Sequence, residues 1–349
     1  MTRRAHVGEA HRRRHVLASR AGFEPVRAAL AKTHALFEVR GADPGAEWTP
    51  VGPDAPFEWD HVRPLASSKR FFFPPSETIL AWRGDDATAV EHAPAPFVLV
   101  GLHPCDLAAI AYQDRFFAAD PWYQARRRQA LLVGLDCAAA CPGGFCRDVG
   151  AGPFASAPFD LELTPLLDGR VVIEAGSDAG AAVLAAAGVP PAPLDADDLH
   201  AYEAARAAAE ASFPPRPFVA RAIARIDAGA VADAEWQALG PACFTCTGCT
   251  NLCPTCSCFT TVDEISDGGG RRVRVWDSCL LEGFQREASG HHPAPRPGDR
   301  VRRFWTHKLA AAFADGFDGR LGCVGCGRCD VTCPGSIGAL PVLSALGER

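Results

Sequence analysis

Two short, uninterrupted apolar segments stand out in the hydrophobic pattern of the first half of the chain. Residues 97–102 (FVLVGL) and 130–136 (ALLVGLD) are apolar at nearly every consecutive position rather than at alternate ones. Such runs are typical of central strands of a parallel sheet, which are buried on both faces. A helix is predicted between them, over residues 105–117, so the pattern indicates an α/β arrangement.

Further elements are predicted up to about residue 230. A helix is expected over 177–188, where Ser177 can cap the first turn and Gly188 can end the last. The other predicted elements are a β-hairpin over 161–167 and 170–175 and helices over 195–213 and about 218–228. Residues 1–80 are rich in Arg, Pro and Ala and have little pattern, and beyond about residue 236 short loops with Gly and Cys prevail.

One cysteine pattern occurs twice in the second half of the chain. The order C-x2-C-x2-C-x3-C-P fills residues 243–254 and again residues 323–334. This spacing is the signature of bacterial ferredoxins with two [4Fe–4S] clusters, in which the last cysteine of each run binds the other cluster. The sequence therefore predicts site A, formed by Cys243, Cys246, Cys249 and Cys333, and site B, formed by Cys323, Cys326, Cys329 and Cys253.

Zinc is the main alternative for these cysteines. A structural zinc site needs four ligands, commonly two CxxC pairs, and this explains neither the third CxxC step nor the trailing Cys-Pro. The chain has 15 cysteines in 349 residues, grouped in such steps, which is typical of metal ligation in a reducing compartment. We therefore expect iron–sulfur clusters and a cytoplasmic location.

The fold class follows from these patterns. We predict an α/β N-terminal domain over residues 1–235 and an α+β ferredoxin-like domain with two clusters over residues 236–349. The two cysteine runs lie 80 residues apart, so residues 254–322 are predicted to be an insertion between them. Residues 271–308 of this insertion carry nine Lys or Arg against four acids. These cations could raise the reduction potential of a cluster or could form a solvated face that contacts a partner.

Seven further cysteines lie outside the two runs. Four of them, Cys105, Cys137, Cys141 and Cys146, are predicted at or near the carboxyl ends of the two buried strands, where ligand sites form in parallel sheets. They could hold a third cluster, with the amides of Gly143 and Gly144 pointing at sulfur, or they could be buried thiols. The remaining three, Cys256, Cys258 and Cys279, are one short of a closed site and are expected to pack around the ferredoxin-like domain.

Charge and motifs exclude several functions. Residues 1–40 carry nine Lys or Arg against three acids, whereas the whole chain has a net charge of −6. Without a nucleic-acid-reading module, this basic segment is expected to be a solvated helical face or a docking tail. The chain has neither a signal peptide pattern nor an apolar run long enough for a membrane helix, so neither nucleic acid nor membrane is an expected partner.

No catalytic residue is expected in this chain. It lacks GxSxG, Walker A and HExxH motifs. His103 lies two residues from Cys105, but this spacing does not show that His103 is placed to act as a base for a Cys105 nucleophile. Residues 150–155 superficially resemble a dinucleotide loop, but they follow no predicted strand and contain Pro153. We therefore expect no flavin or nicotinamide site here.

Several segments resemble one family: the 4Fe–4S dicluster proteins that include beta subunits of cytoplasmic sulfhydrogenases (nickel–iron hydrogenases) and the A subunit of anaerobic sulfite reductase. The matching segments span residues 69–334, in order: KRFFFPPSE, GLHPCDLAAI, DPWYQARR, GLDC…CPGGFC, CTGCTNLCPTCSCF, RVRVWDSC, THKL and GCVGCGRCDVTCP. The resemblance implies an electron-transfer subunit that works beside a flavin-binding NAD(P) subunit and a catalytic hydrogenase or sirohaem reductase subunit. It also implies that Cys105 and the 137–146 group recur in such proteins.

Three functions remain open at this point. The leading hypothesis is a relay of single electrons between a flavin and a remote catalytic centre. One alternative is a self-contained iron–sulfur reductase with catalysis in the α/β half. The other is a structural subunit whose clusters are never reduced, because the potentials of such clusters span a very wide range.

Overall fold

A computed structural model describes residues 13–42, 45–90, 94–156, 158–189, 192–314 and 319–348. The chain forms two compact units. Unit 1 comprises residues 1–67, 94–111 and 127–214, and unit 2 comprises residues 68–93, 112–126 and 215–349. The two units are therefore interleaved along the chain, whereas the sequence predicts a single boundary near residue 235. The basic segment before residue 13 lies outside the described residues.

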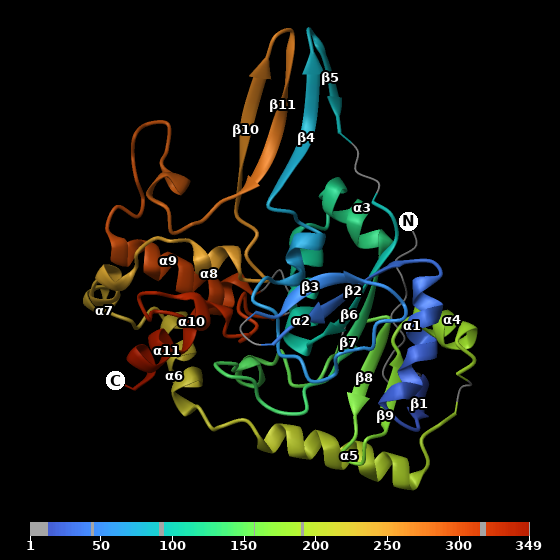
Figure 1. Cartoon of the computed structure of the whole chain (residues 1–349). Coiled ribbons are helices and arrows are strands. Elements are labelled where there is room, and N and C mark those ends of the chain that lie inside the picture. Colours follow the sequence, from blue (N-terminus) through green and yellow to red (C-terminus); the bar gives the residue numbers. More distant parts are fainter. Residues whose placement is uncertain are drawn as a thin grey trace. The chain divides into compact units, whose positions relative to one another are not determined.

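Unit 1 is built on a seven-stranded mixed sheet with the order β1-β9-β8-β7-β6-β2-β3 (Figure 1). The pairs β2/β6, β6/β7 and β7/β8 are parallel, and β1/β9, β8/β9 and β2/β3 are antiparallel. The strands are β1 (Arg13–Leu17), β2 (Ala35–Arg40), β3 (Glu47–Val51), β6 (Phe97–Leu102), β7 (Ala130–Leu135), β8 (Leu161–Pro165) and β9 (Val171–Ala175). The helices of unit 1 are α1 (Glu24–Ala31), α4 (Asp178–Ala186) and α5 (Ala196–Ala211). Helix α2 (Pro104–Phe116) begins in unit 1 and ends in unit 2, and most of α3 (Pro121–Gln129) belongs to unit 2.

The central strands are buried on both faces, as their sequence predicts. Every residue of β6 and β7 is buried. Along β9 successive side chains alternate between two apolar clusters, since Ile173 packs with residues of α1 and α4 while Val172 packs with Tyr202 of α5. The predicted hairpin β8–β9 is confirmed, and so is the cap of α4, because Ser177 Oγ accepts a hydrogen bond from the amide of Gly180.

The described residues between 13 and 80 contain more regular structure than their weak sequence pattern indicates. Three strands of the sheet, β1, β2 and β3, come from this segment. Their polar residues conceal the strand pattern, because β2 carries Glu38 in the core and β1 carries the buried His15. Burial of such polar side chains becomes favourable only when residues elsewhere in the fold form hydrogen bonds or ion pairs with them.

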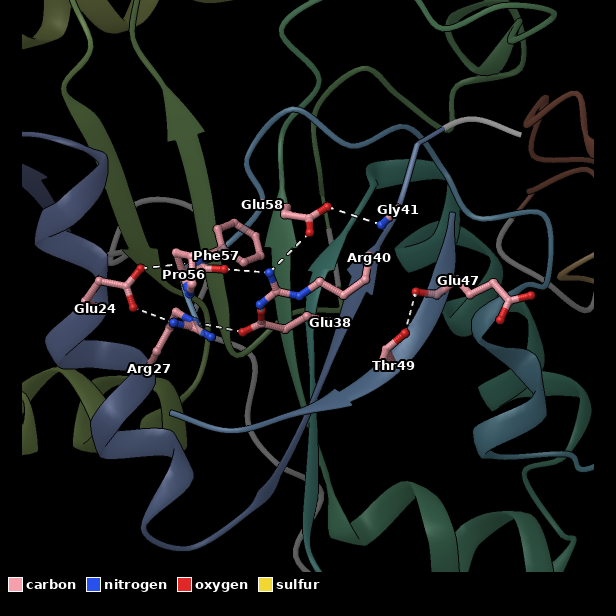
Figure 2. A network of polar contacts seen from close by, with 10 residues as sticks. All are labelled: Glu24, Arg27, Glu38, Arg40, Gly41, Glu47, Thr49, Pro56, Phe57 and Glu58. Atoms are coloured by element: carbon pink, nitrogen blue, oxygen red, sulfur yellow. Dashed lines mark hydrogen bonds and ion pairs between the residues drawn. The ribbon is translucent and has the colours of Figure 1, made fainter. Parts of the chain in front are cut away.

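The partner of Glu38 is Arg27 of α1, and both side chains are fully buried. Arg27 Nε lies 2.7 Å from Glu38 Oε1, while Arg40 Nη2 lies 2.6 Å from Glu38 Oε2 (Figure 2). Arg27 also pairs with Glu24, whose other oxygen accepts from the amide of Phe57. Burial raises the pKa of Glu38, and the hydrogen bond and charge of Arg27 oppose that rise. The network ties α1 to β2 and to the loop after β3.

Replacing Arg27 with Ala should destabilise unit 1 by about 3–5 kcal/mol, because it leaves the Glu38 carboxylate buried without its main partner. Native-state hydrogen exchange of amides in α1 and β2 measures this loss. Arg20→Ala is the matched control: its ion pair with Asp60 is largely exposed and should be worth no more than about 1 kcal/mol. Equal effects of the two substitutions would contradict the buried pairing.

Unit 2 contains a four-stranded antiparallel sheet in the order β10-β11-β4-β5 (Figure 1). Its strands are β4 (Ser76–Arg83), β5 (Asp86–Ala89), β10 (Phe259–Ser266) and β11 (Gly269–Trp276). Buried Arg274 of β11 bonds Glu77 of β4 through Nε at 2.9 Å and also pairs with Asp120. The remaining helices are α6 (Pro217–Asp227), α7 (Asp233–Leu239), α8 (Gly248–Asn251), α9 (Pro297–Leu309), α10 (Arg328–Thr332) and α11 (Ala339–Gly347).

The insertion between the cysteine runs is more ordered than predicted. Its hairpin β10–β11 joins β4, which lies almost 200 residues away in the sequence, so no local signal marks the sheet. All residues of β10 are exposed, which hides the alternation expected of a half-buried strand. Within the described part of the chain, no helix combines the length and apolarity needed to cross a membrane.

Candidate iron–sulfur centre

The two cysteine runs adopt matching backbone conformations. In each run, the residue before the second cysteine and the residue after it have positive φ: Thr245 (51°) and Thr247 (65°) in the first run, Gly325 (61°) and Gly327 (71°) in the second. A short helix then follows, α8 or α10, and these two helices pack together. A β-branched residue rarely tolerates positive φ, so the two threonines are held there against their preference. Both runs therefore wrap the same kind of tight loop.

The fourth cysteine of each run is directed toward the other run. Gly335, two residues after Cys333, lies so close to the start of the first run that an added Cβ would be 1.8 Å from the carbonyl oxygen of Ala242. Thr255, two residues after Cys253, donates a hydrogen bond of 2.6 Å to the carbonyl of Gly322 at the start of the second run. These two contacts are the geometry that crossed ligation requires.

The four thiols predicted for site A line one cavity. Cys243, Cys246 and Cys249 meet Cys333 there, and the other walls include Leu280, Val301, Phe304 and Trp305. Burial raises the pKa of Cys249 to about 12, and the neighbouring thiols Cys243, Cys253, Cys246 and Cys333 add to the rise. A buried thiol at this pKa is costly to ionise without a metal, and four converging thiols fit an iron cluster that replaces the proton.

The thiols predicted for site B are likewise within electrostatic reach of one another. The pKa of Cys329 is raised by burial first, then by Asp330, and then by Cys323, Cys326 and Cys253. Backbone amides point at the sulfurs of predicted ligands in both sites: Gly325 N lies 3.4 Å from Cys323 Sγ, and Ile337 N lies 3.4 Å from Cys333 Sγ. Such donors stabilise a thiolate and help to set the potential of a bound cluster.

Two buried lysines flank site B. Lys308 of α9 donates to Thr255 Oγ1 at 2.7 Å, and this hydroxyl lies 3.2 Å from Cys253 Sγ. Burial alone would lower the pKa of Lys308, but nearby thiols, Cys253 first, raise it well above its usual value. Lys69 donates to the carbonyls of Thr250 (3.0 Å) and Cys256 (3.3 Å) and lies 4.1 Å from the Trp276 ring centroid. Both ammonium groups sit where an anionic cluster would balance their charge.

Most other cations of the basic insertion have different roles. Arg271 and Arg272 form exposed pairs with Glu264 and Asp263 across the β10–β11 hairpin. Arg296 pairs with Asp233 and Asp299. Lys308 therefore lies near Cys253 of the predicted site B, whereas these three arginines form largely exposed ion pairs. Lys69 lies 184 residues before Cys253, and only the fold brings them together.

In unit 1, three of the four additional cysteines lie close together. Burial raises the pKa of Cys137 well above its usual value, and the charges of Cys146 and Cys141 add to the rise. Cys105 lies in the first turn of α2 rather than in a preceding loop, because the helix begins at Pro104. An added Cβ at Gly152 would lie 2.7 Å from Cys146 Sγ and 3.7 Å from Pro104 Cβ, so the start of α2 approaches Cys146 across this glycine.

Two details of this group differ from expectation. The amide of Gly144 bonds the carbonyl of Cys141 (3.0 Å) instead of pointing at sulfur, and its missing side chain leaves room for Cys141 Sγ. His103, considered as a base for Cys105, lies with Nδ1 3.7 Å from Cys137 Sγ and 3.1 Å from the carbonyl of Leu135. No local pattern indicates this contact, since His103 and Cys137 lie 34 positions apart.

Comparison with known proteins decides the family. The 4Fe–4S dicluster domain family matches residues 242–337, which contain both cysteine runs. Sulfhydrogenase 2 subunit beta from Pyrococcus furiosus is 30% identical over 295 residues, which cover 83% of this chain and 85% of that protein. This chain belongs to the 4Fe–4S dicluster family of sulfhydrogenase beta subunits.

Membership in this family confirms the resemblance inferred from the motifs. The C-terminal part of the chain is a 4Fe–4S dicluster domain, so the cofactors of this chain are iron–sulfur clusters rather than zinc ions. Segments that carry the resemblance also build the surroundings of site B in unit 2: Lys69 begins KRFFFPPSE and Lys308 belongs to THKL.

Proposed function

We propose that this chain is the electron-transfer subunit of a cytoplasmic oxidoreductase complex of the hydrogenase type. It would relay single electrons between a flavin- and NAD(P)-binding subunit and a catalytic subunit. The observation that carries the proposal is the pair of matching cysteine loops, each with its fourth cysteine directed toward the other run. Similarity to a sulfhydrogenase beta subunit supports a hydrogenase over a sulfite reductase as the complex.

Sites A and B would each hold one [4Fe–4S] cluster through four thiolates. A bound cluster accepts and gives up one electron at a time, whereas a flavin carries two. The residues of this chain would hold the clusters, exclude water from them and set their potentials. The apolar wall of site A and the two buried lysines of site B support different potentials for the two sites, with site B the higher.

Protein purified without oxygen should contain at least eight irons and eight acid-labile sulfides per chain, because each cubane holds about four of each. Iron and sulfide analysis measures this content. Zinc in place of iron after anaerobic reconstitution would refute the assignment of sites A and B.

A reductive titration separates the three candidate functions. The electron-transfer proposal expects dithionite to reduce the clusters, and NAD(P)H to reduce them only when a flavin subunit is added. Reduction by NAD(P)H without any other subunit would favour a self-contained reductase. Clusters that dithionite cannot reduce would favour a structural role.

We also propose that Cys105, Cys137, Cys141 and Cys146 hold a third [4Fe–4S] cluster in unit 1. The electrostatic contact of Cys137 with Cys146 and Cys141 supports this. Replacing Cys137 with Ser in the full-length chain should then lower the iron content by about four per chain. Val262→Ser, at an exposed position of β10, is the control and should leave iron unchanged. Equal iron in the Cys137 variant and the native chain would identify these residues as packing thiols.

A further inference from the structure

Two cysteines that belong to none of these groups lie in contact at the base of the β10–β11 hairpin. Cys258 precedes β10 and Cys279 follows β11, and both side chains line the same cavity. The hairpin ladder fixes this approach: it pairs Phe259 with Trp276, and the amide of Asp277 donates to the carbonyl of Cys258 at 3.0 Å. Both are free thiols. The sequence indicates packing residues here, but the fold holds them as a pair.

The two thiols differ in reactivity. The hydrogen bond from Cys279 lowers the pKa of Cys258 to about 7 against the effect of burial, and Lys308 and Lys69 also favour the thiolate. The same hydrogen bond and burial raise the pKa of Cys279. Cys258 is also the more accessible of the two, since Cys279 is buried. A partly exposed thiolate beside a buried thiol is the arrangement of a nucleophilic and a resolving cysteine.

Both thiols line an open cavity of about 790 Å³ within unit 2. Arg302, Arg303 and His307 contribute basic groups to its wall. Phenyl rings supply much of the remaining surface, and Phe116, Phe259 and Phe313 are each 40–45% exposed. Basic groups and aromatic rings together favour a small ligand that is anionic and has a flat or apolar body.

The thiol pair also adjoins the cluster sites. Lys308 is in electrostatic reach of Cys253 of site B and of both thiols of the pair. Leu280, the residue after Cys279, lines the site A cavity. The pair therefore shares the neighbour Lys308 with predicted site B and is adjacent in sequence to a wall residue of predicted site A.

We propose that Cys258 and Cys279 form a redox-active dithiol that reduces small anionic disulfides bound in this cavity. The inference rests on the proposed clusters only as the source of electrons. Binding of the disulfide and the thiol–disulfide exchange depend only on residues of unit 2.

The reaction balances as thiol–disulfide exchange. The Cys258 thiolate attacks one sulfur of the bound disulfide, its S–S bond breaks, and the first thiolate product leaves with a mixed disulfide in place. Cys279 then attacks the sulfur of Cys258 and its proton passes to the second thiolate product, which leaves a Cys258–Cys279 disulfide. Two electrons, taken singly from the iron–sulfur clusters of the chain, and one proton from solvent restore the Cys258 thiolate and the Cys279 thiol.

The test uses anaerobic full-length holoprotein and the aromatic anionic disulfide dithiobis(nitrobenzoate) as the probe. One equivalent should release two nitrothiobenzoate ions rapidly, and peptide mapping should then find a Cys258–Cys279 disulfide. Cys258→Ser should slow the rapid phase at least tenfold. Cys279→Ser should release a single ion and keep the mixed disulfide on Cys258. Val262→Ser, the control at an exposed position of β10 in the same hairpin, should behave like the native chain with equal iron.

A second measurement addresses the source of electrons. Clusters are reduced with dithionite, the excess reductant is removed, and the probe is added while the visible absorption of the clusters is followed. Two electrons should leave the clusters per disulfide consumed, and Cys258→Ser should abolish this coupling. A rapid phase that survives in Cys258→Ser, or mapping that finds the native pair as two unlinked thiols, would overturn the dithiol. An intact dithiol with clusters that dithionite cannot reduce would refute the electron-transfer function instead.

Discussion

Replacing Cys333 with Ala is expected to remove the cluster of site A, although the other three ligands of that site lie about 80 residues earlier. The reason is the crossed path of the chain, in which the segment after Cys333 lies against Ala242 at the start of the first run. A cubane that loses one of four thiolates is poorly held, so iron should fall by about four per chain. The cluster of site B, with Cys323, Cys326 and Cys329, should remain.

The reciprocal substitution completes the test. Cys253→Ala should disturb site B and leave site A, because Thr255 ties the segment after Cys253 to Gly322. Electron paramagnetic resonance of the dithionite-reduced variants identifies which cluster is lost in each. The control is Val262→Ser, at an exposed position of β10 in the same unit. If each substitution affected only the cluster of its own run, the crossed assignment would be wrong.

Replacing Lys308 with Met should lower the reduction potential of the site B cluster by on the order of 100 mV. Reduction adds a negative charge, and the buried ammonium of Lys308 stabilises that charge through its position beside Thr255 and Cys253. A unit charge about 6 Å away at an effective dielectric constant of about 20 contributes roughly 3 kcal/mol. For a one-electron couple, about 1.4 kcal/mol corresponds to about 59 mV.

Spectroscopic redox titration measures this shift. Arg272→Met is the control, because Arg272 is an exposed partner of Asp263 on the hairpin and should leave the potential unchanged. Lys69→Met offers an independent variant on a different element and should shift the potential in the same direction. A shift below about 20 mV in both lysine variants would show that these cations do not tune the cluster.

The elements predicted best are those whose signals are local. The strands at residues 97–102 and 130–135 are confirmed because a buried parallel strand must be apolar at consecutive positions. Helix α4 is confirmed because its N-cap is local: Ser177 accepts a hydrogen bond from the amide of Gly180, three residues later. Strands β2 and β10 were missed for the opposite reason. The core position of Glu38 makes sense only with Arg27, and β10 is exposed along its whole length.

The sequence by itself determined the family and predicts how eight cysteines divide between two sites, because cubane ligation depends on cysteine spacing within a short loop. Only the tertiary structure decided what surrounds those sites. Lys69 and Lys308 lie near site B although they are 239 residues apart in the sequence. Cys258 and Cys279 come close together because β10 and β11 pair in a particular register, which depends on both strands. Buried charges and thiol pairs gain their energy from partners distant in the chain, so their roles emerge only when the fold brings those partners together.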